Sequence, residues 1–172
     1  VSFQGIDYAK EQGMTLIIAL DCGIKAVDKV EYASSLGIDF IICDHHLPGD
    51  MLPQAVAILD PKRRECNYPY KELSGCGIGF KLVQALCQKW HLPKEEWLPL
   101  LDLLAVSIGA DIVPITGENR ILAYHGLRMI NSRPRPGFAL LKELAGKKDK
   151  DLSITDVVFM IGPRINAAGR IS

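Results

Sequence analysis

The chain has 172 residues, of which 48% are apolar, so it can form one domain of ordinary size with a sizeable core. Its 20 basic and 20 acidic residues cancel, so bulk charge does not indicate a polyanion partner, and nucleic-acid binding would depend on local sites. Five cysteines without CxxC spacing are typical of reduced cytoplasmic thiols and not of a disulfide framework. The sequence shows no signal peptide and no apolar run of membrane-spanning length, which argues against membrane association.

The first part of the chain alternates between strand and helix patterns. The end of a helix, residues 5–13, precedes a continuous apolar run, 14–20, which is typical of a strand buried on both faces of a parallel sheet. Residues 25–36 carry apolar side chains at helical spacing, and strands are predicted over 39–43 and 56–59. This β–α–β order predicts parallel strands whose carboxyl ends meet at one edge of the sheet.

The second half is predicted to be mostly helical. Its five expected helices carry apolar residues at helical spacing: 78–90, 97–108, 117–131, 138–145 and 154–161. Ser153 is placed to cap the last of them. The glycine-rich segment 74–77 before the first helix fits two interpretations, an anion-binding helix start or a tight turn that requires positive φ. The fold class is therefore α/β, a parallel β-sheet flanked by helices with a mostly helical second half.

Acidic and imidazole side chains follow several of the apolar elements. Asp21 ends the first predicted strand, Asp44, His45 and His46 end the second, and Asp111 follows an apolar helix. Because ligands bind outside the carboxyl ends of strands in open α/β sheets, the first four should converge there. Carboxylates with imidazole suit Mn²⁺ or Mg²⁺, and a pair of such ions can clamp a phosphoryl group. The alternative is a surface turn that happens to carry two histidines.

Five segments in order resemble the DHH phosphoesterase superfamily and, within it, the RecJ-like exonucleases specific for single-stranded DNA. The segments are 20–23, 44–46, 74–81, 110–114 together with 117–120, and 163–170. The resemblance covers nearly the whole chain. It implies a metal-dependent phosphodiesterase that degrades single-stranded DNA in the 5′→3′ direction, in DNA repair and recombination, with two Mn²⁺ or Mg²⁺ ions.

The resemblance also implies a role for each residue of the cluster. Asp21 corresponds to a bridging metal carboxylate, His45 to a metal ligand and Asp111 to a further ligand of the same ion. His46 corresponds to the histidine that contacts the scissile phosphate. Asp44 is expected to assist catalysis by orienting an imidazole and not by binding metal directly.

Further positions of the family pattern lie in the second half. Arg164 and Arg170 resemble residues near the substrate path and are expected to contact phosphate, with a helix-end salt bridge as the alternative. For the glycine-rich segment 74–77 the resemblance favours a structural turn near the site.

The family pattern also predicts how the chain is divided. Residues 1–132 are expected to form a DHH domain that lacks its aspartate-rich first motif, and residues 133–172 a helical extension toward a C-terminal domain. The chain is therefore expected to be an internal piece that binds metal weakly by itself and has little or no nuclease activity. The missing strand would leave an exposed sheet edge that could pair with a second copy.

Two other functions remain open from the sequence. One is hydrolysis of short oligonucleotides or cyclic dinucleotides with the same metal core, and the other is a non-catalytic nucleic-acid-binding module. The expected partner is single-stranded DNA, and a single-stranded-DNA-binding protein or a helicase are candidate protein partners. The expected location is the cytoplasm.

Overall fold

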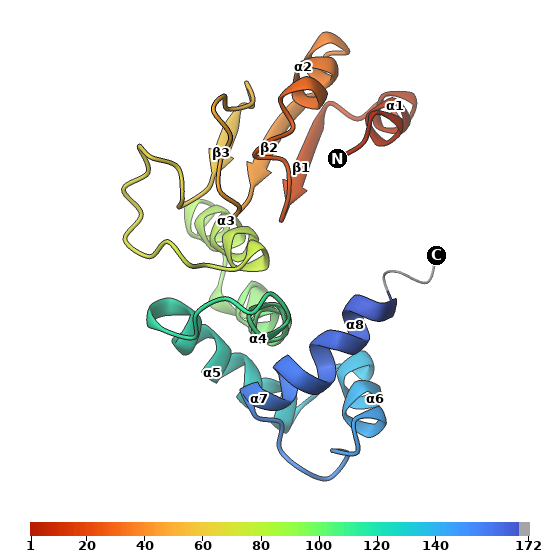
Figure 1. The fold of residues 1–172 in the computed structure, drawn as a ribbon, viewed down its shortest axis with the longest axis vertical. Helices are drawn as coiled ribbons and strands as arrows, with labels where there is room; N and C mark the ends of the chain where they lie inside the picture. The colour runs from red at the N-terminus through yellow and green to blue at the C-terminus, as the bar shows by residue number, and fades with distance from the viewer. Residues whose placement is uncertain (169–172) are drawn as a thin grey trace. The chain divides into compact units, whose positions relative to one another are not determined.

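The computed structural model describes residues 1–168, which fold as two compact units, Val1–Lys71 and the chain from Glu72 onward. A parallel sheet with helices makes up the first unit, and helices make up the second, so the predicted α/β class is confirmed (Figure 1). The predicted division at residue 132 stays a prediction. Within the described range, no helix combines the length and apolarity needed to cross a bilayer.

The sheet of the first unit has the parallel arrangement that the β–α–β pattern predicts. Over the described residues its strands are β1 (Leu16–Leu20), β2 (Asp39–Cys43) and β3 (Ala57–Leu59), in the order β1-β2-β3. Leu20 lies opposite Cys43, and Cys43 lies opposite Leu59. The carboxyl ends of all three strands therefore lie at one edge (Figure 1).

Two helices and the sheet enclose the core of the first unit. Helix α1 (Phe3–Glu11) starts at Ser2, whose hydroxyl accepts a hydrogen bond from the backbone N–H of Gly5, and helix α2 (Val27–Ser35) joins β1 to β2. The core residues are buried and apolar: Ile6, Ala9, Ala19, Val30, Ala33, Ile38, Phe40 and Ile42.

Strand β1 departs from the prediction of burial on both faces. Leu16, Ile18 and Leu20 are 44%, 46% and 53% exposed, whereas Ala19 is buried. The continuous apolar run does form a strand, but the strand lies at an edge of the described sheet and only one of its faces packs against the core. Apolarity alone could not report this difference, because it depends on which elements cover the second face.

The second unit is built from helices of very different lengths. Its α-helices are α3 (Gly75–Lys89), α4 (Leu101–Ala110), α5 (Gly117–Ser132), α6 (Pro136–Leu144), α7 (Ile154–Asp156) and α8 (Gly162–Ala168). Short 3₁₀ turns at Lys94–Glu96 and Leu98–Leu100 connect α3 to α4, and Val157–Ile161 is π-helical. Helices α4 and α5 pack closely: a Cβ atom at Gly126 would lie 2.0 Å from the carbonyl oxygen of Leu101. Only glycine permits that approach.

The last helical segment is longer than predicted. Ser153 caps it as expected and forms a capping box with Asp156. The helix was predicted to end at Ile161, but it continues through Gly162 and Pro163 to Ala168. A π-helical turn, Val157–Ile161, ends two residues before Pro163, a residue with no N–H to donate, so the wider turn accommodates a proline that would break a regular α-helix.

Candidate metal centre

A strained turn after β1 presents the first acidic side chain. The backbone N–H of Asp21 donates to the carbonyl of Cys43 at 2.8 Å, which extends the pairing of β1 with β2 by one residue. Asp21 then adopts φ 62°, a left-handed conformation that is uncommon outside glycine and that recurs at functional sites. Gly23 follows with φ 112°. The turn leaves the Asp21 side chain half exposed at the carboxyl edge of the sheet.

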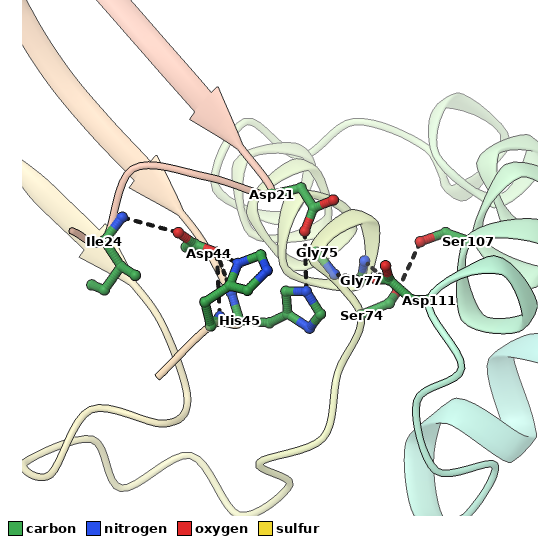
Figure 2. A network of polar contacts seen from close by, with 10 residues as sticks. Asp21, Ile24, Asp44, His45, Ser74, Gly75, Gly77, Ser107 and Asp111 are labelled. Carbon is green, nitrogen blue, oxygen red and sulfur yellow. Dashed lines mark hydrogen bonds and ion pairs between the residues drawn. The ribbon is translucent and has the colours of Figure 1, made fainter. Parts of the chain in front are cut away.

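Asp44, the first residue after β2, anchors this edge. It is only 1% exposed, and its Oδ2 accepts from the N–H of Ile24 at 2.9 Å. Its Oδ1 accepts from the N–H of His45 at 2.8 Å (Figure 2). The same oxygen accepts from Nδ1 of His46 at 2.7 Å. Burial by itself would raise the pKa of Asp44, but these hydrogen bonds outweigh it and hold the pKa below its ordinary value. Asp44 is therefore an ionised acceptor whose bonds fix the turn.

The two histidines have different surroundings. The His45 side chain is 11% exposed, and its Nε2 lies 3.1 Å from Oδ1 of Asp21. The His46 side chain is 58% exposed, and its ring packs edge-on against His45 with centroids 4.6 Å apart. One ligand-type atom from each of Asp21, His45 and His46 lies within 4.8 Å of the others, a spacing that can hold a metal ion.

The structure thus brings together the four residues that the strand pattern placed at this edge. A cavity of about 380 Å³ in the first unit is lined by Asp21, Asp44 and His46. Lys25 also lines it, a residue that was not predicted from the sequence to belong to the site. Its position directly after the Asp21 turn is the signal that could have identified it, because a lysine beside a phosphoryl site supplies a positive charge.

Asp111 belongs to the second unit. It ends α4, where its N–H donates to the carbonyl of Ser107, and its Oδ2 accepts from the N–H of Gly75 at 3.4 Å. Ser107 also donates from its hydroxyl to that of Ser74 at 3.1 Å (Figure 2). Asp111 is therefore part of a polar cluster at the start of α3.

The glycine-rich segment is a capped helix start, and its interpretation as a tight turn with positive φ is wrong. Gly75 and Gly77 are the first and third residues of α3, and neither has positive φ. Ser74 caps the helix by accepting from the N–H of Gly77. A Cβ atom at Gly77 would lie 3.3 Å from the capping hydroxyl of Ser74, a slightly tight contact, so the space beside the cap, and not backbone conformation, favours a small residue there.

Of the two arginines predicted to contact phosphate, only Arg164 lies among the described residues. Arg164 in α8 donates to the carbonyl of Met160 at 2.5 Å and to that of Leu144 at 3.4 Å. These bonds hold its guanidinium against backbone carbonyls within the second unit. Arg170 lies outside the described residues.

Comparison with known proteins places this geometry in a family. A model of the DHH family, N-terminal domain, matches residues 3–108. The chain is 43% identical over 176 residues to the single-stranded-DNA-specific exonuclease RecJ of Escherichia coli (strain K12), covering 96% of this chain and 30% of that protein. It is 45% identical over 162 residues to RecJ of Bacillus subtilis (strain 168), covering 94% of this chain and 20% of that protein.

A solved structure extends the likeness to the fold. The crystal structure of exonuclease RecJ bound to manganese superposes with a TM-score of 0.84 at 32% identity, covering 99% of this chain and 42% of that one. The chain spans 30% or less of the length of the two curated relatives described above.

Proposed function

Because the chain belongs to the DHH family, we propose that it forms the metal-binding part of a phosphodiesterase that digests single-stranded DNA from the 5′ end. The observation that carries the proposal is the convergence of Asp21, His45 and His46 at the carboxyl edge of a parallel sheet. The names of the relatives supply the substrate class, since both are single-stranded-DNA-specific exonucleases. The direction of digestion and a role in repair and recombination follow from the same resemblance.

The residues present fit a divalent cation. Asp21 Oδ1 and His45 Nε2 lie 3.1 Å apart, which allows both atoms to contact one ion between them. Asp21 keeps a left-handed backbone that presents its carboxylate, a strain that a binding role explains. Mn²⁺ or Mg²⁺ suits a carboxylate-containing site, and the superposed relative binds manganese. A bound ion of this kind polarises a phosphoryl oxygen and lowers the pKa of its water.

His46 is placed to act on the substrate and Asp44 to orient it. A carboxylate only accepts hydrogen bonds, so the 2.7 Å contact with Asp44 Oδ1 puts a proton on Nδ1 of His46. The Nε2 atom of this exposed ring then remains for the substrate. Protonated there, it can donate to a phosphoryl oxygen or to the leaving group. Asp44 stays ionised because its pKa is lowered, so it holds the ring in this orientation at neutral pH.

Three residues of the second unit extend the proposal. Asp111 is proposed as a further ligand of the ion held by Asp21 and His45. Arg164 and Arg170 are proposed to contact phosphate, which for Arg164 requires release of the carbonyls of Met160 and Leu144. A second ion, if bound, would need ligands beyond Asp21 and His45, so the two-metal arrangement is also part of this proposal.

The cellular compartment and the protein partners are also part of the proposal. Five free cysteines, of which Cys43 and Cys87 are buried, support a reducing compartment such as the cytoplasm. A single-stranded-DNA-binding protein or a helicase remains a predicted partner.

The test is degradation of single-stranded DNA by the full-length protein with Mn²⁺. We expect release of mononucleotides from the 5′ end, lost in His46→Ala, and unchanged in Asp39→Asn, a control at the exposed start of β2. Turnover of short oligonucleotides or cyclic dinucleotides alone would redirect the proposal to another DHH substrate. DNA binding without turnover would contradict it.

A further inference from the structure

A third acidic residue ends the third strand, and no role follows for it from the family resemblance. Leu59 lies opposite Cys43 in the parallel register, and the N–H of Asp44 donates to the carbonyl of Leu59 at 3.0 Å. Asp60 therefore follows β3 at the same level at which Asp44 follows β2. The three strands of the described sheet thus end in Asp21, Asp44 and Asp60, all at the edge that carries the histidines.

Asp60 is buried, and one of its carboxylate oxygens receives no hydrogen bond from the described residues. The residue is 2% exposed, and its Oδ1 accepts from the N–H of Lys62 at 2.8 Å. Its Oδ2 is fully buried and receives no hydrogen bond from any described residue. A buried polar atom without a partner costs about 1–3 kcal/mol, so a carboxylate at this position calls for an explanation. Ser or Ala there would avoid the cost.

The surroundings of Asp60 act on its pKa in both directions. Burial raises its pKa above the ordinary value, the N–H of Lys62 opposes this shift, and the negative charge of Asp44 adds to it. The positive charges of Lys62 and His45 act in the opposite direction. The hydrogen bond from the N–H of Asp44 to the carbonyl of Leu59 keeps the segments after β2 and β3 side by side, so Asp60 lies beside the Asp44–His45 segment.

The ring of His45 offers the matching donor. Its Nε2 faces Asp21 at 3.1 Å, and its Nδ1, on the other side of the ring, is buried within the protein. A histidine that binds metal through one nitrogen usually donates the N–H of the other to a carboxylate or a carbonyl, which fixes the tautomer and makes the ligand more basic.

We infer that Asp60 is a positioning residue for the metal centre: its Oδ2 accepts the Nδ1–H of His45 and keeps Nε2 available for the ion. The inference rests on the proposed metal site and adds to it a residue that touches neither ion nor substrate. The hydrogen bond requires Asp60 Oδ2 and His45 Nδ1 to approach to about 3 Å, the length of an N–H···O bond. The orphaned oxygen and the buried ring nitrogen then satisfy each other.

The test compares metal binding and the His45 tautomer in variants of the full-length protein. Asp60→Asn keeps the size and one acceptor oxygen but removes the charge, and Asp60→Leu removes both. Asp39→Asn is the matched control, because Asp39 is an exposed aspartate at the opposite end of the same sheet. We expect Mn²⁺ affinity, measured by calorimetry, to fall about 10-fold in Asp60→Asn and up to about 100-fold in Asp60→Leu, with Asp39→Asn unchanged.

The tautomer gives a readout that a purely structural role would not change. With ¹⁵N-labelled histidine and Mg²⁺, which is diamagnetic, the ring of His45 (assigned with His45→Gln) should carry its proton on Nδ1 in the wild type. Asp60→Leu, which has no acceptor, should yield a mixture of tautomers. In Asp60→Asn the single oxygen must give up the N–H of Lys62 to accept from His45, so the share of the wild-type tautomer should lie between those of the wild type and Asp60→Leu.

Each outcome separates this inference from the proposed function. If the wild type binds metal and cleaves DNA but the Asp60 variants behave like Asp39→Asn, the positioning role is wrong and the function stands. If the wild type binds metal with the expected dependence on Asp60 but cleaves no nucleic acid, the function is wrong and the positioning role stands. A wild type that binds no metal overturns both.

Discussion

Replacing Asp44 with asparagine should destabilise the first unit by about 2–4 kcal/mol. Asp44 accepts with Oδ2 from the N–H of Ile24 and with Oδ1 from His45 and His46, so both oxygens are used. The asparagine amide must replace one of them with a donor. The less costly orientation of the amide turns its NH₂ group toward Ile24. The backbone N–H of Ile24, a residue that is only 1% exposed, then has no acceptor, which costs about 1–3 kcal/mol of stability. Weaker bonds from the histidine to a neutral acceptor add to this cost.

The difference in unfolding free energy between the wild type and Asp44→Asn should become smaller in acid. The pKa of Asp44 is lower in the folded chain than its ordinary value of 3.8, so the charged form stabilises the fold. That stabilisation is complete above about pH 4, the unfolded value, and is lost as pH falls through the lower folded value. Asparagine does not titrate. The gap between wild type and Asp44→Asn should therefore be constant from neutral pH down to about pH 5 and should narrow in more acidic solution.

Urea denaturation followed by far-ultraviolet circular dichroism measures this gap. Both tryptophans, Trp90 and Trp97, lie in the second unit, so their fluorescence would not report on Asp44 directly. Asp39→Asn, on the exposed start of β2, should change stability by no more than about 0.5 kcal/mol. A gap for Asp44→Asn as small as that control, or one that widens in acid, would refute the reasoning.

Three further predictions use other parts of the structure. His46→Ala should reduce turnover by roughly 10²–10⁴-fold while Mn²⁺ affinity, by calorimetry, changes little, and a parallel loss of metal binding would contradict its assignment to the substrate. Gly126→Ala should lower the free energy of unfolding by about 3 kcal/mol or more in a denaturation experiment, because its Cβ would lie 2.0 Å from the carbonyl oxygen of Leu101. The control Gly137→Ala, whose Cβ would have no atom within 4 Å, should leave the stability unchanged or raise it. Lys25→Ala should weaken single-stranded DNA binding and lower its salt dependence by about one ion, and an unchanged slope would exclude a phosphate contact.

Local sequence signals predicted those features of the fold that a single physical cause determines. Strand β2 has the predicted bounds, 39–43, because its apolar run is delimited by a glycine on one side and a polar triplet on the other. The parallel order follows from chain connectivity alone, and it places Asp21 beside the Asp44–His45–His46 segment. The N-cap at Ser153 is likewise a local signal and forms as predicted; the structure adds that Asp156 completes a capping box.

The remaining features depend on contacts between distant parts of the chain. The exposure of β1 depends on what covers its second face, and a run of apolar letters carries no information about that. Gly75 and Gly77 are consistent with a turn until the cap at Ser74 is seen, and Pro163 suggests a helix end until the π-helical turn before it is seen. Asp60 is an ordinary strand-ending residue in the sequence, and only burial and the unused Oδ2 single it out.

The most direct test of the metal centre is anomalous X-ray diffraction from crystals of the full-length protein containing Mn²⁺. We expect a manganese peak bonded to the carboxylate of Asp21 and to Nε2 of His45, lost in Asp21→Ala and retained in His46→Ala. A peak that avoids Asp21 and His45, or one that persists in Asp21→Ala and disappears in His46→Ala, would contradict it.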